Sequence, residues 1–189
     1  LIEQYHYLGY SRPVGEHLEY MAMSYGRPLA CVGWCSAPRH IGCRDRYLGW
    51  TLGQRVRNLC RIVTNTRFLI LPWVKVPHLA SHLLGLMARR ISGDWERVYH
   101  HEVVWVETFV DPQRYRGTVY RAANWILCGE TKGFSRIRHG YTATASSPKM
   151  VFLKPLEADA RALLCGAVLK APYRTGGTKM MLKAEQMES

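Results

Sequence analysis

The chain has 189 residues, of which 48% are hydrophobic, and this argues against an intrinsically disordered protein and allows one buried core. The formal charge is +12, from 26 lysines and arginines against 14 acids. The longest apolar runs, such as Phe68 to Leu71, are too short to cross a bilayer, so we expect no membrane partner.

The first half of the chain predicts a hairpin and a helix around a basic loop. In chain order we expect the end of a helix over 1–10, two strands over 17–25 and 29–35, a Pro-, Gly- and Arg-rich loop over 37–49, and a helix over 51–62. Thr51 is a suitable N-cap, and Val56, Leu59 and Cys60 follow at helical spacing.

The second half alternates short apolar runs with helical patterns. We expect strands over 67–74, 103–110 and 150–153, and helices from Pro77 to Ile91, over 115–127 and over 157–169. A hairpin followed by β-α-β-α-β predicts an α/β fold, a mixed sheet with helices on both faces. We expect one domain over 1–169 and a loosely ordered tail over 170–189.

The positive charge is clustered. Residues 27–75 hold nine basic residues and one acid, Asp45, and residues 114–154 hold eight basic residues and one acid, Glu130. Most of the basic residues are arginine, which binds phosphate through two parallel hydrogen bonds and stacks on bases. Nucleic acid, DNA ahead of RNA, is the expected partner; a solvated basic face and a surface for an acidic protein are the alternatives.

Aromatic residues alternate with arginines over 44–50 and 114–121. Rings beside phosphate-binding arginines suit a protein that binds a single strand or a flipped base. We therefore expect nucleic-acid contacts from Arg44, Arg46, Tyr47, Trp50, Arg55, Arg57, Arg114 and Arg116.

Glu107 is the first candidate for catalysis. It lies in an apolar strand, and a period of two places it on the face of Trp105 and Phe109. Burial raises the pKa of a carboxyl group and makes it a candidate general base. The alternative is a buried carboxylate paired with an arginine.

Three further residues are candidates near the reacting groups. His6 lies between two tyrosines and is a candidate acid–base or base-stacking group, with Tyr7 assisting. Asp111 either caps the turn that begins at Pro112 or holds Arg114 or Arg116 toward a substrate.

No motif predicts a metal site. His78 and His82 lie four apart, but no glutamate follows the first histidine and no third ligand is evident. The six cysteines lack zinc-site spacing, and several sit in apolar stretches, which is typical of reduced cysteines in a cytoplasmic protein. We expect no signal peptide, because no basic region opens the sequence, and the first residue, Leu1, is consistent with a further segment upstream.

Several strings resemble the DruA family, which occurs in Druantia anti-phage systems and in transposon-associated proteins. They are HYLGY (6–10), GRPLACVGW (26–34), DRYLGW (45–50), NTRFLILPWVKVPHLASHLL (65–84) and ETFVDPQRYRGTVYRAANW (107–125), and together they cover roughly 1–164. The resemblance implies a role in genome defence or mobile DNA, with a helicase or transposase as a further partner.

The same segments resemble a degenerate core of the GNAT acyltransferases. In that family a strand, a loop and a helix N-terminus hold the coenzyme A pyrophosphate. The resemblance implies cofactor contacts from Lys75, His78 and Ser81. The loop lacks the family's glycines, which argues against acyl-CoA and leaves the cofactor open.

Three hypotheses for function follow. The first is a nucleic-acid-binding protein of defence or mobile elements, which also modifies or processes DNA or RNA. The second is a GNAT-like transferase that acts on a nucleic acid or a small molecule, with Glu107 as the base. The third is a non-catalytic adaptor that recruits a helicase or transposase.

Overall fold

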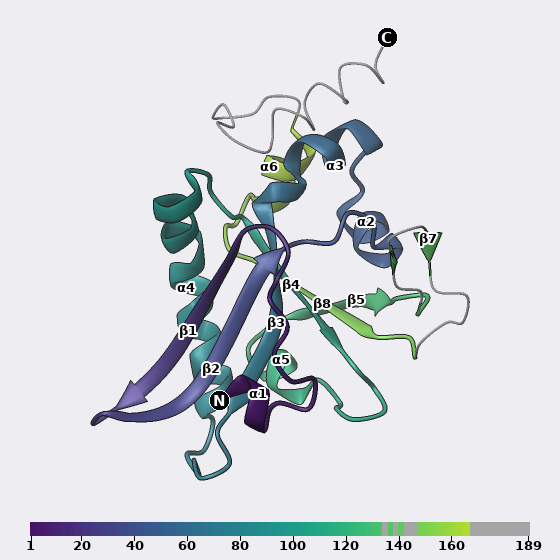
Figure 1. Cartoon of the computed structure of the whole chain (residues 1–189). Coiled ribbons are helices and arrows are strands. Elements are labelled where there is room, and N and C mark those ends of the chain that lie inside the picture. The colour runs from purple at the N-terminus through teal and green to yellow at the C-terminus, as the bar shows by residue number, and fades with distance from the viewer. Residues whose placement is uncertain (134–135, 138–139, 142–146, 167–189) are drawn as a thin grey trace.

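A six-stranded mixed sheet organises the chain (Figure 1). The computed structural model describes residues 1–133, 136–137, 140–141 and 147–166, so the expected tail lies outside the described residues. The strands run in the order β1 (His17–Ser24), β2 (Arg27–Ser36), β3 (Ile62–Ile70), β4 (Trp105–Val110), β8 (Met150–Pro155) and β5 (Ile126–Glu130). Only β3 and β4 pair in parallel; the other neighbours in this sheet are antiparallel.

Six α-helices, one 3₁₀ turn and a small second sheet complete the described part of the fold. The helices are α1 (Ile2–Tyr5), α2 (Gly42–Leu48), α3 (Leu52–Asn58), α4 (Leu79–Tyr99), α5 (Thr118–Ala122) and α6 (Ala160–Cys165), with the turn at Leu59–Arg61. Strands β6 (Arg136–Ile137) and β7 (Gly140–Tyr141) pair with each other. As expected, Thr51 caps α3, where its side chain and that of Gln54 form a reciprocal capping box.

Helices cover both faces of the sheet, as the sequence predicts. On one face, α4 packs Leu84, Ile91 and Trp95 in a cluster that includes Val106 and Phe152 of the sheet. On the other face, residues of α2, of the 3₁₀ turn after α3 and of α6 pack in a cluster with the sheet; they include Leu48, Leu59, Leu164, Ile62 and Leu153. Successive strand residues alternate between these clusters, which is the period-two pattern of a sheet buried on both sides.

Two expected elements differ in the structure. The basic loop contains a helix, α2, whose buried residues include Cys43, Arg44 and Leu48, and Gly49 ends it in the left-handed conformation (φ 72°). The helix expected over 115–127 stops at Ala122, because Asn124 reverses the chain at φ 59° and the edge strand β5 follows. Ile126 and Leu127 are partly exposed there, so their apolar character does not mark a buried face.

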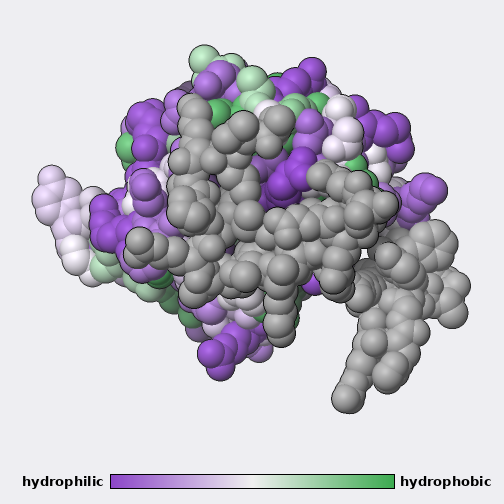
Figure 2. All heavy atoms as spheres, turned by 90° about the horizontal axis from the view of Figure 1, so that it is seen from above, coloured by the Kyte–Doolittle hydropathy of each residue, from purple (hydrophilic) through white to green (hydrophobic). Residues whose placement is uncertain are grey.

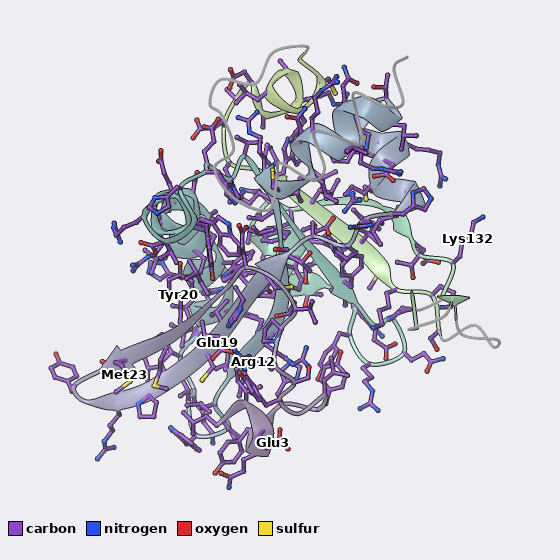
Figure 3. The ribbon with its side chains drawn as sticks, turned by 45° about the horizontal axis from the view of Figure 1, so that its top comes forward. Glu3, Arg12, Glu19, Tyr20, Met23 and Lys132 are labelled. Carbon is purple, nitrogen blue, oxygen red and sulfur yellow. The ribbon has the colours of Figure 1, made fainter. Side chains whose placement is uncertain are left out.

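The remaining differences concern boundaries. Strand β3 begins at Ile62, inside the segment expected to end a helix, and stops at Ile70 ahead of Pro72. Helix α6 is shorter than expected, and β8 is two residues longer than the expected strand. Hairpin β1–β2 extends away from the body of the fold, with Met23 near its tip (Figure 3).

Candidate functional site

A cleft of about 510 Å³ opens where β3 and β4 stop pairing. The two strands are paired only from Ile62 to Asn65 on β3 and from Trp105 to Thr108 on β4. Further along, β3 continues beside β2 and β4 beside β8. The volume lies in the range of ligand-binding clefts. Its walls come from α1 and the residues after it, both strands, the loop into α5, and Lys149.

The walls of the cleft are basic. Arg67, Arg116 and Lys149 line it, and no aspartate or glutamate stands among the described residues that line it. Arg67 is fixed: its Nε donates to the Gly9 carbonyl at 3.0 Å and its Nη2 to the Ser11 hydroxyl at 3.1 Å. A fixed positive charge in a concave site attracts anions more strongly than the same charge on a flat surface.

A buried polar network forms the floor. The Tyr120 hydroxyl donates to Asn65 Oδ1 at 3.0 Å, and the Thr108 hydroxyl donates to the Asn65 carbonyl at 3.1 Å. Burial raises the pKa of Tyr120 to about 12, so its phenol stays protonated. Because these groups bond to one another, the floor has a fixed geometry before any ligand binds.

His6 lines the cleft as a neutral imidazole. The backbone N–H of Leu8 donates to its Nδ1 at 3.2 Å, so Nδ1 carries no proton and Nε2–H is a donor. Burial and the positive charge of Arg67 hold the pKa of His6 below its ordinary value of 6.5. The residue expected as an acid or base is therefore a hydrogen-bond donor at neutral pH.

We expect an NMR titration to show His6 changing protonation below pH 6.5. The Arg67→Gln variant should raise the pKa of His6, because it removes a cation that opposes protonation. A midpoint at or above 6.5 in the unaltered protein would contradict the assigned protonation state.

Glu107 lies outside this cleft, in the cluster of side chains beneath α2. It is fully buried, and its Oε2 is 3.2 Å from Arg44 Nη1. Burial raises its pKa, and the Arg44 charge and a hydrogen bond from Thr64 (2.9 Å) act in the opposite direction. This is the buried ion pair that we expect from the sequence as the alternative to a general base. Thr64 lines the cleft and is the link between Glu107 and that site.

The expected phosphate contact from Arg44 is not supported by the structure, because the side chain is fully buried. Its guanidinium also donates to the Pro38 carbonyl at 3.0 Å and to Asp45 at 3.1 Å. Buried charges need such partners, and these leave no face for a nucleic acid.

The other residues expected from the first basic segment lie on α2, on α3 or, for Trp50, between the two helices, and none of them lines the cleft. The Trp50 indole is buried and donates to Asp45 at 3.2 Å, and Arg55 pairs with the same carboxylate at 2.9 Å. Arg161 lies over the ring of Tyr47, at 5.0 Å. Arg46 is exposed and Arg57 half-buried. Seen from the end that carries α3 and α6, hydrophilic residues lie on several sides (Figure 2).

The second segment does reach the cleft. Arg116 lines the cleft together with Tyr7 from the N-terminal segment. The Arg114 guanidinium lies 5.0 Å from the centre of the Tyr7 ring. Asp111 accepts the backbone N–H of Gln113 at 3.0 Å and lies 3.8 Å from Arg114 Nε. Asp111 therefore caps the turn and lies within ion-pair distance of Arg114, and its expected role toward a substrate stays a prediction.

The residues expected to bind a cofactor do not line this cleft. Lys75 and His78 are exposed ahead of α4, and Ser81 donates to the His78 carbonyl at 3.1 Å. Ser81 and His82 line a second hollow of about 850 Å³ between α4 and the end of α5. Among the described residues, no group of three His, Cys, Asp or Glu side chains is placed to hold a metal ion.

Sequence reasoning missed Arg67, Asn65, Thr108, Tyr120 and Lys149. One signal was present: the polar run Asn65 to Arg67 interrupts an apolar strand, which is unusual for a strand between two others. The convergence of α1, β3 and α5 on one cleft has no local signal, because it joins segments that are far apart in the sequence.

Fold and site together define a single-domain mixed α/β protein with a basic cleft between two parallel strands. The chain belongs to the DruA family: the family described as Druantia protein DruA matches it over residues 1–149. Comparison with curated proteins finds no match. No helix in the described part of the chain is long and apolar enough to cross a membrane.

Solved structures similar to this chain include acetyltransferases. One is the aminoglycoside acetyltransferase AAC(6')-Ib in complex with ribostamycin and coenzyme A, at 16% identity and a TM-score of 0.47; the match covers 76% of this chain and 65% of that chain, slightly under two thirds. Another is an N-acetyltransferase from Staphylococcus aureus Mu50, at 9% identity and a TM-score of 0.48, over 75% and 68% of the two chains. A third is a GNAT acetyltransferase from Bacillus cereus ATCC 10987, at 11% identity and a TM-score of 0.41, over 71% and 68%.

Proposed function

We propose that this DruA-family protein binds nucleic acid, DNA ahead of RNA, through the cleft between β3 and β4, and that it acts in anti-phage defence or mobile-element biology. The observation that carries the proposal is the lining of the cleft: Arg67, Arg116 and Lys149 without an acidic residue among the described lining residues. Clustered lysine and arginine side chains in a concave site attract the phosphates of a nucleic acid, and this cleft is large enough for one nucleotide unit.

The exclusion of acids from the cleft supports this over a general basic surface. Elsewhere the described arginines are often neutralised locally: Arg44 and Arg55 both pair with Asp45, and Arg90 and Arg97 both pair with Asp94. Paired charges contribute little to polyanion binding, because their field is cancelled at short range. The cleft charges are not cancelled in this way by a lining carboxylate.

The double variant Arg116→Glu/Lys149→Glu should weaken binding to a labelled oligonucleotide by about 10- to 100-fold, because it replaces two phosphate contacts by repulsion. The slope of log affinity against log salt should also fall, by roughly 1 for each phosphate contact that the variant removes. Fluorescence anisotropy over a salt series measures both quantities.

The matched control is Arg27→Glu/Arg89→Glu. It makes the same change in net charge at two exposed residues that do not line the cleft. We expect it to lower affinity several-fold less than the cleft variant, through the overall field alone. Equal losses in the two variants would reject the cleft as the binding site, and no binding by the unaltered protein would reject the proposed function.

The defence role has a separate test in cells. In a bacterium whose anti-phage system uses this protein as its DruA component, the cleft variant should lose protection in a plaque assay, while the control variant retains it. Immunoblots must show equal protein levels. Full protection by the cleft variant would separate the defence role from nucleic-acid binding at this cleft.

A further inference from the structure

The mouth of the cleft carries a group of partly exposed aromatic rings. Tyr5, His6 and Tyr7 reach it from α1 and the residues that follow, and Tyr115 reaches it from the loop between β4 and α5. The rings of His6 and Tyr7 stack at 4.9 Å with an interplanar angle of 28°, and Tyr7 and Tyr115 lie 5.4 Å apart. Tyr7 is 39% exposed and Tyr115 50% exposed, although both carry large aromatic rings.

These rings are held in place from several sides. Glu3 accepts the backbone N–H of Tyr10 at 2.5 Å, and Arg67 of β3 donates to the carbonyl of Gly9, so the segment after α1 is tied to the sheet. Glu3 extends from α1 at the end of the molecule opposite α6 (Figure 3). Rings that stay exposed while their backbone is fixed form a preorganised stacking surface, which lowers the entropy cost of binding a flat ligand.

Cations stand beside the rings. Arg114 covers the Tyr7 ring at 5.0 Å, and Arg116 and Lys149 line the same cleft. Rings that stack on bases next to cations that contact the backbone form the usual binding surface for single-stranded nucleic acid. Among the described residues, this is where ring clusters and cleft-lining cations coincide.

We propose that the cleft takes an unpaired nucleotide of a single strand, with its base stacked on the exposed Tyr115 ring beside Tyr7 and its flanking phosphates beside Arg116 and Lys149. The inference rests on the proposed function and adds its substrate class. In a duplex the faces of the bases are covered by their neighbours, so only an unpaired or flipped base can offer a face to these rings. The cleft volume of about 510 Å³ suits one such unit.

His6 adds a contact to the edge of the base. Its Nδ1 is occupied by the Leu8 N–H, which leaves Nε2–H as a donor in the cleft. A neutral N–H donor can hydrogen-bond to the carbonyl oxygens and unprotonated ring nitrogens of a base, which are themselves uncharged. Base binding here therefore combines stacking with a hydrogen bond at one edge.

The first test compares three probes with the same phosphate content per strand: a short thymidine oligonucleotide, its duplex with the complementary adenosine strand, and the same oligonucleotide with abasic sites at its centre. We expect the intact single strand to bind at least about 10-fold more tightly than the duplex. The abasic strand should bind about 5- to 100-fold more weakly, because stacking on aromatic rings is removed while the phosphates remain.

The second test uses the rings themselves. Tyr7→Ala/Tyr115→Ala should lower single-strand affinity by about 10-fold or more and leave the salt slope unchanged, since no charge is altered. Tyr25→Ala is the matched control, because Tyr25 is fully exposed at the turn of the β1–β2 hairpin and does not line the cleft. Tyr115→Phe keeps the ring and should retain affinity, which separates stacking from loss of the fold.

The outcomes separate the two proposals. Equal binding of single strand, duplex and abasic strand, with salt-dependent loss in the charge variants, overturns the single-strand inference and leaves nucleic-acid binding intact. No binding of any probe overturns both. Loss of affinity in Tyr115→Phe or in Tyr25→Ala as large as in the double alanine variant also overturns the stacking role.

Discussion

Replacing Arg44 by methionine is expected to destabilise the fold by about 3–5 kcal/mol, because it leaves the Glu107 carboxylate buried without its counter-charge. Both side chains are fully buried, and they lie 3.2 Å apart. For a chain of this length such a loss lowers the thermal midpoint by roughly 6–20 °C. Calorimetry or a circular-dichroism melt measures it.

The pH dependence of this effect has a definite sign. Burial already raises the pKa of Glu107, and removal of Arg44 raises it further. A group whose pKa is higher in the folded state favours folding at low pH and loses that contribution as the pH rises through its folded pKa. The destabilisation caused by Arg44→Met should therefore be smallest near pH 4 and grow toward neutrality.

Two variants serve as controls for the ion pair. Arg46→Met changes an exposed arginine on the same helix and should stay within about 0.5 kcal/mol of the unaltered protein. Arg44→Met/Glu107→Gln removes both charges and should recover much of the loss. If Arg44→Met and Arg46→Met have the same thermal midpoint, the buried ion pair does not stabilise this fold.

The sequence predicts those parts of the fold whose signals are local. The apolar stripe of α4, with Leu83 and Ile91, and the buried run of β4 both follow from periodicity. The period-two argument also identifies Glu107 as buried. It does not identify Arg44 as the partner, because the partner comes from a segment whose arginines, Pro and Gly resemble a loop.

The candidate site depends on contacts that no local pattern encodes. Arg67 belongs to a strand, and its role follows from the carbonyl of Gly9, more than fifty residues earlier. Lys149 joins the cleft from the residues just ahead of β8. The alternation of arginines and tyrosines predicts ligand contacts from Arg114 and Arg116, but it predicts no cleft. Composition thus predicts the chemistry of the site, and only the tertiary fold shows where it lies.

Gly117→Ala is expected to cost about 2–4 kcal/mol, because Gly117 has two independent requirements for glycine. Its φ of +67° lies in the left-handed region, where a side chain costs about 1 kcal/mol or more. A Cβ atom there would also lie 2.5 Å from Cζ of Phe152, whose ring is fully buried and has no room to move. Chemical denaturation measures the loss.

Gly49→Ala is the control that separates the backbone cost from the contact with Phe152. Gly49 ends α2 with nearly the same backbone angles (φ 72°, ψ 20°, against 67° and 20°), but nothing lies within 4 Å of its added Cβ. It should therefore lose only the backbone cost of about 1 kcal/mol. The excess loss of stability in Gly117→Ala then measures the contact with Phe152. Equal losses in the two variants would mean that the Phe152 ring moves aside at little cost. Because Gly117 also lines the cleft at the start of α5, only its variant should weaken oligonucleotide binding under conditions where both proteins remain folded.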